Sequence, residues 1–170
     1  MGIAITLQNY LKTRGVEFDV VEHDYSEGSI NTAHAAHIST RSLAKGVVFR
    51  DEDLHYTMAV LPSQNKVKRH TLNQIFDRRL ELADEDELDD LFQDCAHGAI
   101  PVMGQAYEIN VIWDDELLQS DEIYMEAGDH EHLIHITKDQ FERLMCSFMH
   151  EHFSSTLPGL EIEQSYRPSA

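Results

Sequence analysis

The sequence predicts a mixed α+β domain with about six or seven strands and helices on its periphery. Runs rich in β-branched and aromatic residues, which are typical of strands, recur along the chain. Segments with apolar residues three and four positions apart, which are typical of helices, stand at both ends and between the strands. The length of 170 residues and the apolar fraction of 42% are those of one compact domain.

The first forty residues predict a helix, a strand and a second helix. Apolar residues at helical spacing cover residues 3–11, and a glycine follows them. Residues 18–23 combine apolar and polar neighbours in the manner of a strand. Asn31 or Thr32 can cap a short helix that ends near residue 38.

The middle of the chain contains two strongly strand-like runs, residues 45–50 (KGVVFR) and 54–61 (LHYTMAVL). The polar residues 51–53 between them have the length and polarity of a hairpin loop. The pattern then predicts a helix at 70–76, a brief strand at 80–82, a helix at 85–92, strands at 109–113, 123–126 and 132–137, and a closing helix at 138–148.

We expect one domain over residues 1–153 and a tail or linker over 154–170, because the last stretch contains two prolines and a glycine. No apolar run is long enough to cross a bilayer, and the N-terminus has no signal-peptide pattern. Cys95 and Cys146 have neither metal-ligand nor redox spacing. These features predict a cytoplasmic protein with no membrane association.

Charge is unevenly distributed along the chain. The formal net charge is −18, so the protein as a whole is expected to repel nucleic acid. Residues 41–79 nevertheless hold eight of the 13 basic residues and four acidic ones, a net charge of +4, whereas residues 80–131 hold 17 acidic residues and no Lys or Arg. The acidic run at 84–87 is typical of a solvated surface, whereas the basic segment could face phosphates.

Two places could carry chemistry through a cation or through backbone groups. Lys45 stands at the head of an apolar strand, where its ammonium could hold a phosphate or a carboxylate. An edge-strand lysine that discourages aggregation is the commoner explanation. In the loop from His97 to Gly104 (HGAIPVMG), glycine lets backbone N–H groups approach a ligand and proline stiffens the chain. An ordinary connecting loop is the commoner alternative there.

The segment 128–135 (GDHEHLIH) is the third such place. Asp129 and His130 could pair, which would fix the tautomer of the imidazole or bind a substrate amine. His130, His132 and His135 do not match a standard zinc spacing, and His135 would point away from the other two in a strand. We therefore expect no metal site and no cofactor, and we expect His135 to be a satisfied strand histidine.

The chain has no nucleophile elbow, Walker loop or dinucleotide fingerprint. Its segments together resemble the YbaK family, also called the prolyl-tRNA-synthetase-associated editing domain. The similarity runs from about Ile3 to Met145. It rests on an N-terminal helix and on five stretches in a fixed order: VEHD (21–24), NTAHAAHI (31–38), KGVVFRDEDLHYTMAVLP (45–62), CAHGAIPVMG (95–104) and EAGDHEHLIHI (126–136).

The resemblance implies a central, mostly antiparallel, barrel-like mixed sheet with helices around it. It also implies hydrolysis of the ester that links a small amino acid, of the alanine, cysteine or serine type, to the terminal ribose of tRNA. Lys45 matches the family's anchoring lysine, and Gly98 matches the first glycine of its G-x-x-x-P loop. The implied catalytic residues are Lys45, Gly98 and Ala99, and the implied substrate pocket contains His23, Gly46, Pro101, Gly128, Asp129 and His130.

Two positions depart from the family pattern. Many members follow the lysine with Asn or Thr, where this chain has Gly46. Val102 stands where the loop proline is expected, and Pro101 comes one place early. These departures favour an alternative, a non-catalytic module that binds tRNA or an aminoacyl group as the sensor part of a larger regulatory protein.

A tRNA substrate needs cations on this acidic chain. We expect four basic residues to contact phosphates near the aminoacylated 3′ end: Arg41, Lys66, Lys68 and Arg69. An aminoacyl-tRNA synthetase is a further expected partner, because it would relieve the weak affinity of an acidic surface for tRNA.

Overall fold

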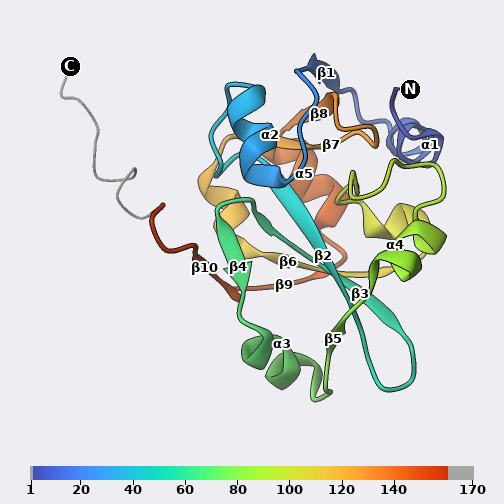
Figure 1. The fold of residues 1–170 in the computed structure, drawn as a ribbon, viewed down its shortest axis with the longest axis vertical. Helices are drawn as coiled ribbons and strands as arrows, with labels where there is room; N and C mark the ends of the chain where they lie inside the picture. The colour runs from blue at the N-terminus through green and yellow to red at the C-terminus, as the bar shows by residue number, and fades with distance from the viewer. Residues whose placement is uncertain (1, 161–170) are drawn as a thin grey trace.

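The computed structural model describes residues 2–160, which form five α-helices, ten strands and two 3-10 helices (Figure 1). The helices are α1 (Ile5–Thr13), α2 (Ser29–Ala35), α3 (Arg69–Phe76), α4 (Glu85–Leu91) and α5 (Lys138–Met145). The strands are β1 (Asp19–Glu22), β2 (Ala44–Arg50), β3 (Tyr56–Pro62), β4 (Asn65–Val67), β5 (Glu81–Leu82), β6 (Asn110–Asp114), β7 (Glu122–Glu126), β8 (His132–Thr137), β9 (Met149–Glu151) and β10 (Ser154–Thr156). The 3-10 helices are η1 (Gly104–Tyr107) and η2 (Asp115–Gln119).

β2 and β3, with seven residues each, are the centre of a five-stranded sheet with the order β5-β2-β3-β6-β9. The two strands pair antiparallel along their whole length. The chain turns between them on Asp51, whose carboxylate accepts the N–H groups of Asp53 and His55 at 2.9 Å each. The predicted hairpin is therefore confirmed.

A second sheet has the order β1-β8-β7 and is antiparallel throughout. It meets the first sheet where Leu43, just before β2, forms a parallel bridge with Tyr124 of β7. The Tyr124 N–H also donates to the carbonyl of Ser42 at 2.8 Å. Because the bridge is parallel, the residues two positions further on, Lys45 and Glu126, lie at about the same level on neighbouring strands.

The strands do not close into a barrel. They fall into three sheets, the third being β4 with β10, so the expected barrel-like closure is not seen. Antiparallel pairing does predominate, in five of the seven strand pairings, while β3–β6 and β6–β9 are parallel. The expected six or seven strands are too few, because β4, β9 and β10 have three residues each and are too short for alternation to reveal.

Successive strand residues point to opposite faces of the five-stranded sheet, and each face packs against its own apolar core. Val48 and Met58 point into the main core, which they share with α1, α5 and the three-stranded sheet. Phe49 and Leu61 point into a second core, which α3 covers with Leu72. In Figure 1, α3 lies at one end of the molecule and α2 at the other, with β2 and β3 running between them.

The helices stand close to their predicted places. Capping boxes begin two of them, Asp84 with Glu87 at α4 and Thr137 with Gln140 at α5. α5 ends at Met145, earlier than predicted, and the chain soon enters β9. None of the helices in the described part of the chain is long and apolar enough to cross a membrane.

The domain continues past the expected boundary. Ser154 of β10 pairs with Val67 of β4, and Phe153 is fully buried in the second core. The buried carboxylate of Asp114 accepts the N–H of Phe153 at 2.9 Å and the hydroxyl of Ser154 at 2.7 Å. The tail expected from residue 154 therefore starts with an ordered strand, and residues 161–170 lie outside the part of the chain that the structure describes.

Candidate active site

A cavity of about 180 Å³ opens beside the start of β2. Four segments that are distant in sequence surround it: the start of α2, the beginning of β2, the loop after α4 and the end of β7. Three residues of the predicted site line it, namely Lys45, Gly46 and Gly98. The other lining residues are Gly28, Ser29, Leu43, Ala44, Ile100 and Glu126.

Lys45 lies at the boundary between this cavity and a second one of about 330 Å³. Its ammonium donates to the carbonyl oxygen of Ser63 at 3.1 Å, and burial lowers its pKa. No carboxylate of residues 2–160 forms an ion pair with it. The ammonium is therefore available to an anionic group of a ligand.

The loop after α4 has uncommitted backbone donors in the described structure on two residues that line the small cavity, with one correction to the prediction. Gly98 has a φ of +80°, a conformation that favours glycine. The N–H of Ala99 is already used, because it donates to the carbonyl of Ala96 at 3.0 Å, and Ala99 is fully buried. The N–H groups of Gly98 and Ile100 have no protein acceptor within residues 2–160. Ile100, which lines the cavity, thus replaces Ala99 as the second candidate donor.

The residues after Ile100 support the loop from behind. Pro101 is buried and does not line the cavity, in contrast to its expected place in the substrate pocket. Val102, which stands at the family's proline position, is fully buried in the main core. The loop is therefore held by core packing of its second half.

Gly46 packs closely against the side chain of Met58. A Cβ atom at this position would lie 2.8 Å from the sulfur and 3.1 Å from the Cγ of Met58, which is fully buried. Met58 therefore occupies space that a polar side chain after the lysine would need.

Glu126 is the ionisable lining residue that was not predicted from the sequence. Burial raises its pKa to about 7, although nearby His130 and the Thr32 hydroxyl favour the ionised form. The Thr32 hydroxyl donates to Oε1 at 3.4 Å, whereas Oε2 is buried without a partner in the described structure. The available signal was an acidic residue in the otherwise apolar strand 123–127 (IYMEA).

The expected pair between Asp129 and His130 does not form. Asp129 instead pairs with His132, at 2.7 Å from Oδ2 to Nδ1, and its Oδ1 accepts the N–H groups of Glu131 and His132. Burial works to raise the pKa of Asp129, but these hydrogen bonds outweigh it and the pKa lies below its usual value. Asp129 therefore stabilises the turn between β7 and β8 and does not line the cavity.

His130 lies behind Gly98 and His23 lies on the neighbouring segment. Nε2 of His130 is 2.6 Å from the carbonyl oxygen of His97, and Nδ1 of His23 is 2.8 Å from that of Asp24. A carbonyl only accepts, so each of these nitrogens carries a proton, and in the neutral ring the other nitrogen is an acceptor. Those other nitrogens, Nδ1 of His130 and Nε2 of His23, are buried without a donor in the described structure.

Gly128 and His135 were also predicted to have roles in this region. Gly128 packs against α1, since a Cβ there would lie 3.0 Å from that of Ala4, so its role is in packing and not in lining the cavity. His135 pairs with Asp19 and with Glu122 in the sheet, which confirms it as a satisfied strand histidine.

The second cavity has an apolar lining and a basic rim. Val47, Phe49, Val67 and Leu82 form its apolar part, and Lys45, Lys66 and Arg69 supply the cations. Two of the expected tRNA-contacting residues, Lys66 and Arg69, are thus brought beside Lys45. The other two, Lys68 and Arg41, do not line this cavity.

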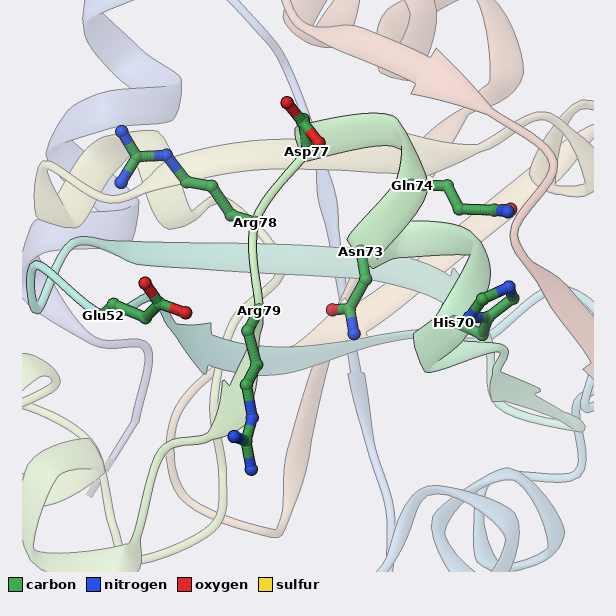
Figure 2. Close-up of a pocket in the computed structure, with 7 residues that line it drawn as sticks. All are labelled: Glu52, His70, Asn73, Gln74, Asp77, Arg78 and Arg79. Carbon is green, nitrogen blue, oxygen red and sulfur yellow. The ribbon is translucent and has the colours of Figure 1, made fainter.

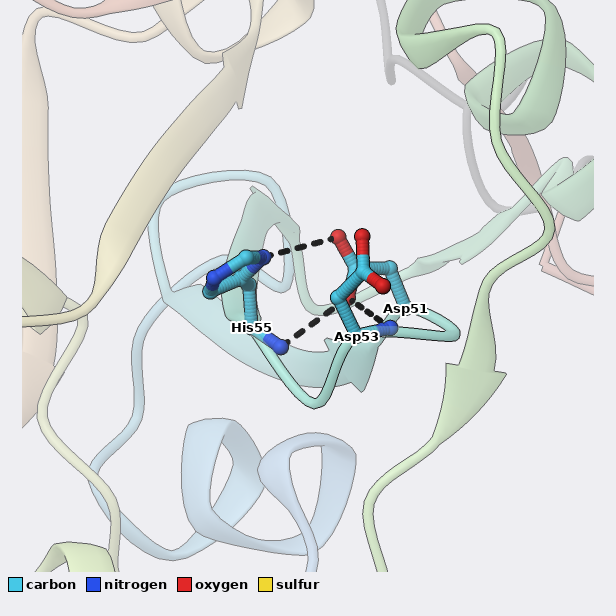
Figure 3. A group of neighbouring side chains, drawn as sticks. All are labelled: Asp51, Asp53 and His55. Carbon is cyan, nitrogen blue, oxygen red and sulfur yellow. Dashed lines mark hydrogen bonds and ion pairs between the residues drawn. The ribbon is translucent and has the colours of Figure 1, made fainter.

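Two groups of side chains within the described residues have metal-like proximity. Asp51, Asp53 and His55 lie at the tip of the β2–β3 hairpin (Figure 3). The Arg78 guanidinium bridges both carboxylates there, at 3.0 Å and 2.7 Å, in the place a cation would take. The second group is Asp114, Glu116 and His152, in which the Asp114 oxygens already accept four hydrogen bonds. The side chains of both groups are therefore engaged in hydrogen bonds and ion pairs that stabilise the surrounding chain.

A wider depression of about 650 Å³ lies beside α3 (Figure 2). Its residues come from α3, from the hairpin tip and from the segment after α3. The side chains of Glu52, Arg78 and Arg79 point in different directions in Figure 2 and do not converge on one point. This depression therefore lacks the convergent groups of the small cavity.

Three solved structures share the fold. One is the hypothetical protein APE2540, which is 15% identical to this chain with a TM-score of 0.78. The match covers 88% of this chain and 99% of that protein. The chain is 21% identical to a candidate trans-editing enzyme for prolyl-tRNA synthetase, with a TM-score of 0.77 and coverage of 89% and 96%. It is 14% identical to a candidate signal transduction protein from Marinobacter aquaeolei VT8, with a TM-score of 0.73, covering 88% of this chain but 30% of that longer one.

These similarities show that the chain has the same α+β fold as three proteins whose descriptions differ from one another. A comparison with curated protein sequences finds no match. The family model described as the aminoacyl-tRNA editing domain matches residues 27–144, which include Lys45, the Gly98 loop and Glu126. The chain therefore belongs to the aminoacyl-tRNA editing domain family, as the resemblance in its sequence implies.

Proposed function

We propose that this domain hydrolyses the ester bond of misacylated tRNA that carries a small amino acid, of the alanine, cysteine or serine type, acting in trans in the cytoplasm. The observation that carries the proposal is that Lys45, Gly98 and Ile100 line one small cavity, and that the N–H groups of Gly98 and Ile100 have no acceptor among the described residues. Membership of the editing-domain family supports it. The volume of about 180 Å³ favours a small side chain.

The chemistry needs little from side chains, because an aminoacyl ester is already activated. A water oxygen forms a bond to the carbonyl carbon, the bond from that carbon to the ribose oxygen breaks, and the proton that the water loses goes to the ribose oxygen. The N–H groups of Gly98 and Ile100 stabilise the negative charge that develops on the carbonyl oxygen. Lys45 holds a nearby phosphate and so fixes the position of the ester.

The second cavity extends this arrangement to the tRNA end. Its apolar lining suits the base or ribose of a terminal nucleotide, and Lys66 and Arg69 on its rim suit the adjoining phosphates. Because Lys45 lines both cavities, the ester linkage would lie beside Lys45, with the aminoacyl group on one side and the nucleotide on the other.

The test is hydrolysis of a panel of mischarged tRNAs, with Lys45→Ala compared with wild type. We expect the release of one or more small amino acids, and we expect Lys45→Ala to lower kcat/KM by about tenfold or more, because a charged hydrogen bond is lost. Lys138→Ala removes a lysine at the start of α5, which does not line either cavity, and is the matched control. Unchanged hydrolysis by Lys45→Ala would exclude the anchoring role.

A second function is a non-catalytic module that binds tRNA or an aminoacyl group as a sensor. The match to 30% of a longer candidate signal transduction protein favours it, because the same fold there is one part of a larger chain. Gly46 and Val102 favour it as well, since both depart from the family pattern. Binding of mischarged tRNA without release of the amino acid would identify this function, and an aminoacyl-tRNA synthetase partner would fit either one.

A further inference from the structure

The carboxyl group of Glu126 is an unsatisfied polar group on the wall of the small cavity. Its Oε2 is buried and has no hydrogen-bond partner in the described structure, while Oε1 has one long contact with Thr32 at 3.4 Å. A buried carboxylate oxygen without a donor costs folding free energy. When such a group lines a ligand cavity, we expect the ligand to supply the missing hydrogen-bond donor.

The neighbouring buried polar atom has the same character. Nδ1 of His130 is an acceptor in the neutral ring, because Nε2 is committed to the carbonyl of His97. It is also without a partner in this part of the chain. His130 lies near Glu126, and its Cε1 is 3.7 Å from where a Gly98 Cβ would be. The region around the cavity therefore has acceptors and needs a donor.

The donor that fits best is a protonated amine. An ammonium offers three N–H donors and a positive charge, whereas a hydroxyl offers one donor and no charge. Every aminoacyl ester carries one such group at its α position, whatever its side chain. The Lys45 ammonium does not supply this donor, since it forms no hydrogen bond or ion pair with Glu126 in the described structure.

We propose that Glu126 binds the protonated α-amino group of the aminoacyl ester, with His130 as a neighbouring acceptor. This inference rests on the proposed site and adds a recognition rule to it. The cavity then selects for a free α-amine on the aminoacyl group: hydroxyacyl and N-acylated esters lack the ammonium and leave the Glu126 carboxylate without a donor. Glu126 then binds the positively charged α-amino group of the substrate, and Lys45 binds a negatively charged phosphate near the ester.

Binding of two non-hydrolysable probes tests this rule without requiring catalysis. The probes are 3′-(L-alanylamino)-3′-deoxyadenosine and its L-lactoyl counterpart, in which a hydroxyl replaces the α-amine. We expect wild type to bind the alanyl probe about tenfold more tightly, as for one hydrogen bond to a charged group. Glu126→Gln should lose this preference while its affinity for the lactoyl probe stays the same.

Glu122→Gln is the matched control, because Glu122 is an exposed carboxylate on the same strand that pairs with His135. It should keep the preference of wild type for the alanyl probe. A preference that persists in Glu126→Gln, or no preference in wild type, would overturn the inference.

The titration of Glu126 gives a second readout that a merely structural role would not move. The charged or titratable groups around it are His130 and Asp129 on the following turn, Cys95 before the loop and Lys45 across the cavity. An ammonium at Oε2 stabilises the ionised form, so the alanyl probe should shift the carboxyl ¹³C titration of Glu126 to lower pH. The lactoyl probe should leave it in place; equal shifts with both probes would contradict amine recognition.

The two proposals fail in different ways. Absence of hydrolysis with an intact alanyl preference would remove the deacylase function and leave amine recognition standing, as in a sensor. Hydrolysis of alanyl-tRNA and lactyl-tRNA at equal rates would keep the deacylase and remove the role of Glu126.

Discussion

At the scale of single residues, the candidate site depends on which polar groups lack a hydrogen-bond or ion-pair partner in the described structure. Lys45 is a candidate ligand-binding residue because no carboxylate in the described chain forms an ion pair with it. Glu126 is another, because its Oε2 has no donor among the same residues. Asp129 shows the opposite case, since its two oxygens are fully engaged by the turn that it stabilises. A chemically suitable residue is available to a ligand only where the fold does not already use it.

Gly46 leads to a prediction about stability. Gly46→Ala should lower the free energy of unfolding by about 1–3 kcal/mol, because the new Cβ meets buried Met58 at 2.8 Å and the core must shift. Urea denaturation followed by circular dichroism measures the change. Gly2→Ala is the control, since nothing lies within 4 Å of a Cβ there, and it should change stability by less than about 0.5 kcal/mol. Equal stability of the two variants would contradict the packing argument.

At the scale of elements, short strands late in the chain hold the basic rim in place. β10 pairs with β4, which carries Lys66, and α3 begins with Arg69 two residues after β4. The hydroxyl of Ser154 links these elements, because it donates to Asp114 and accepts from Asn65 at 2.9 Å. The second cavity thus depends on residues that lie past the boundary predicted from sequence.

Ser154→Ala should therefore cost about 1–3 kcal/mol of stability, because buried Asp114 and Asn65 each lose a partner. The measurement is the urea midpoint at constant slope. Ser155→Ala, in the same strand, has no side-chain hydrogen bond in the described structure and should stay within about 0.5 kcal/mol of wild type. If both serines can be replaced at equal cost, the link through Asp114 does not support β10.

At the scale of the whole molecule, the fold concentrates cations that the sequence only scatters. Lys45, Lys66 and Arg69 surround one apolar cavity in a chain of net charge −18. The acidic helix α4 instead lies far from α3 in Figure 1, beside the loop of the small cavity. A nucleic acid approaching this molecule is therefore expected to be attracted to one face and repelled by the rest.

The salt dependence of tRNA binding tests this arrangement. We expect affinity to fall with added salt, and we expect Lys66→Gln with Arg69→Gln to reduce the log–log slope by roughly 1.4, at about 0.7 for each single-strand phosphate contact. Fluorescence anisotropy at several salt concentrations gives the slopes. Lys12→Gln with Arg143→Gln changes the net charge equally, but on α1 and α5 away from the cavity. Equal slopes for the two double variants would refute a localised site.

Much of the fold could be predicted because long elements have clear periodicity. β2, β3, β7, β8 and the five α-helices all lie close to their predicted ranges. The three missed strands are too short for a period to show. The expected barrel is replaced by three separate sheets, and an isolated bridge at Leu43 joins the two larger ones. Pairing between sheets is a tertiary property that local patterns do not encode.

The site was predicted in part for the same reason. The sequence by itself determined the family, through the order of its motifs, and it predicted a candidate site at Lys45 and the Gly98 loop. Only the tertiary structure decided that the N–H of Ile100, and not that of Ala99, lacks an acceptor in the described part of the chain, and that Asp129 binds His132. It also brought Glu126 to the cavity that Lys45 lines. The physical reason is that hydrogen-bond commitment and burial depend on contacts between segments far apart in sequence, which residue type and spacing alone do not fix.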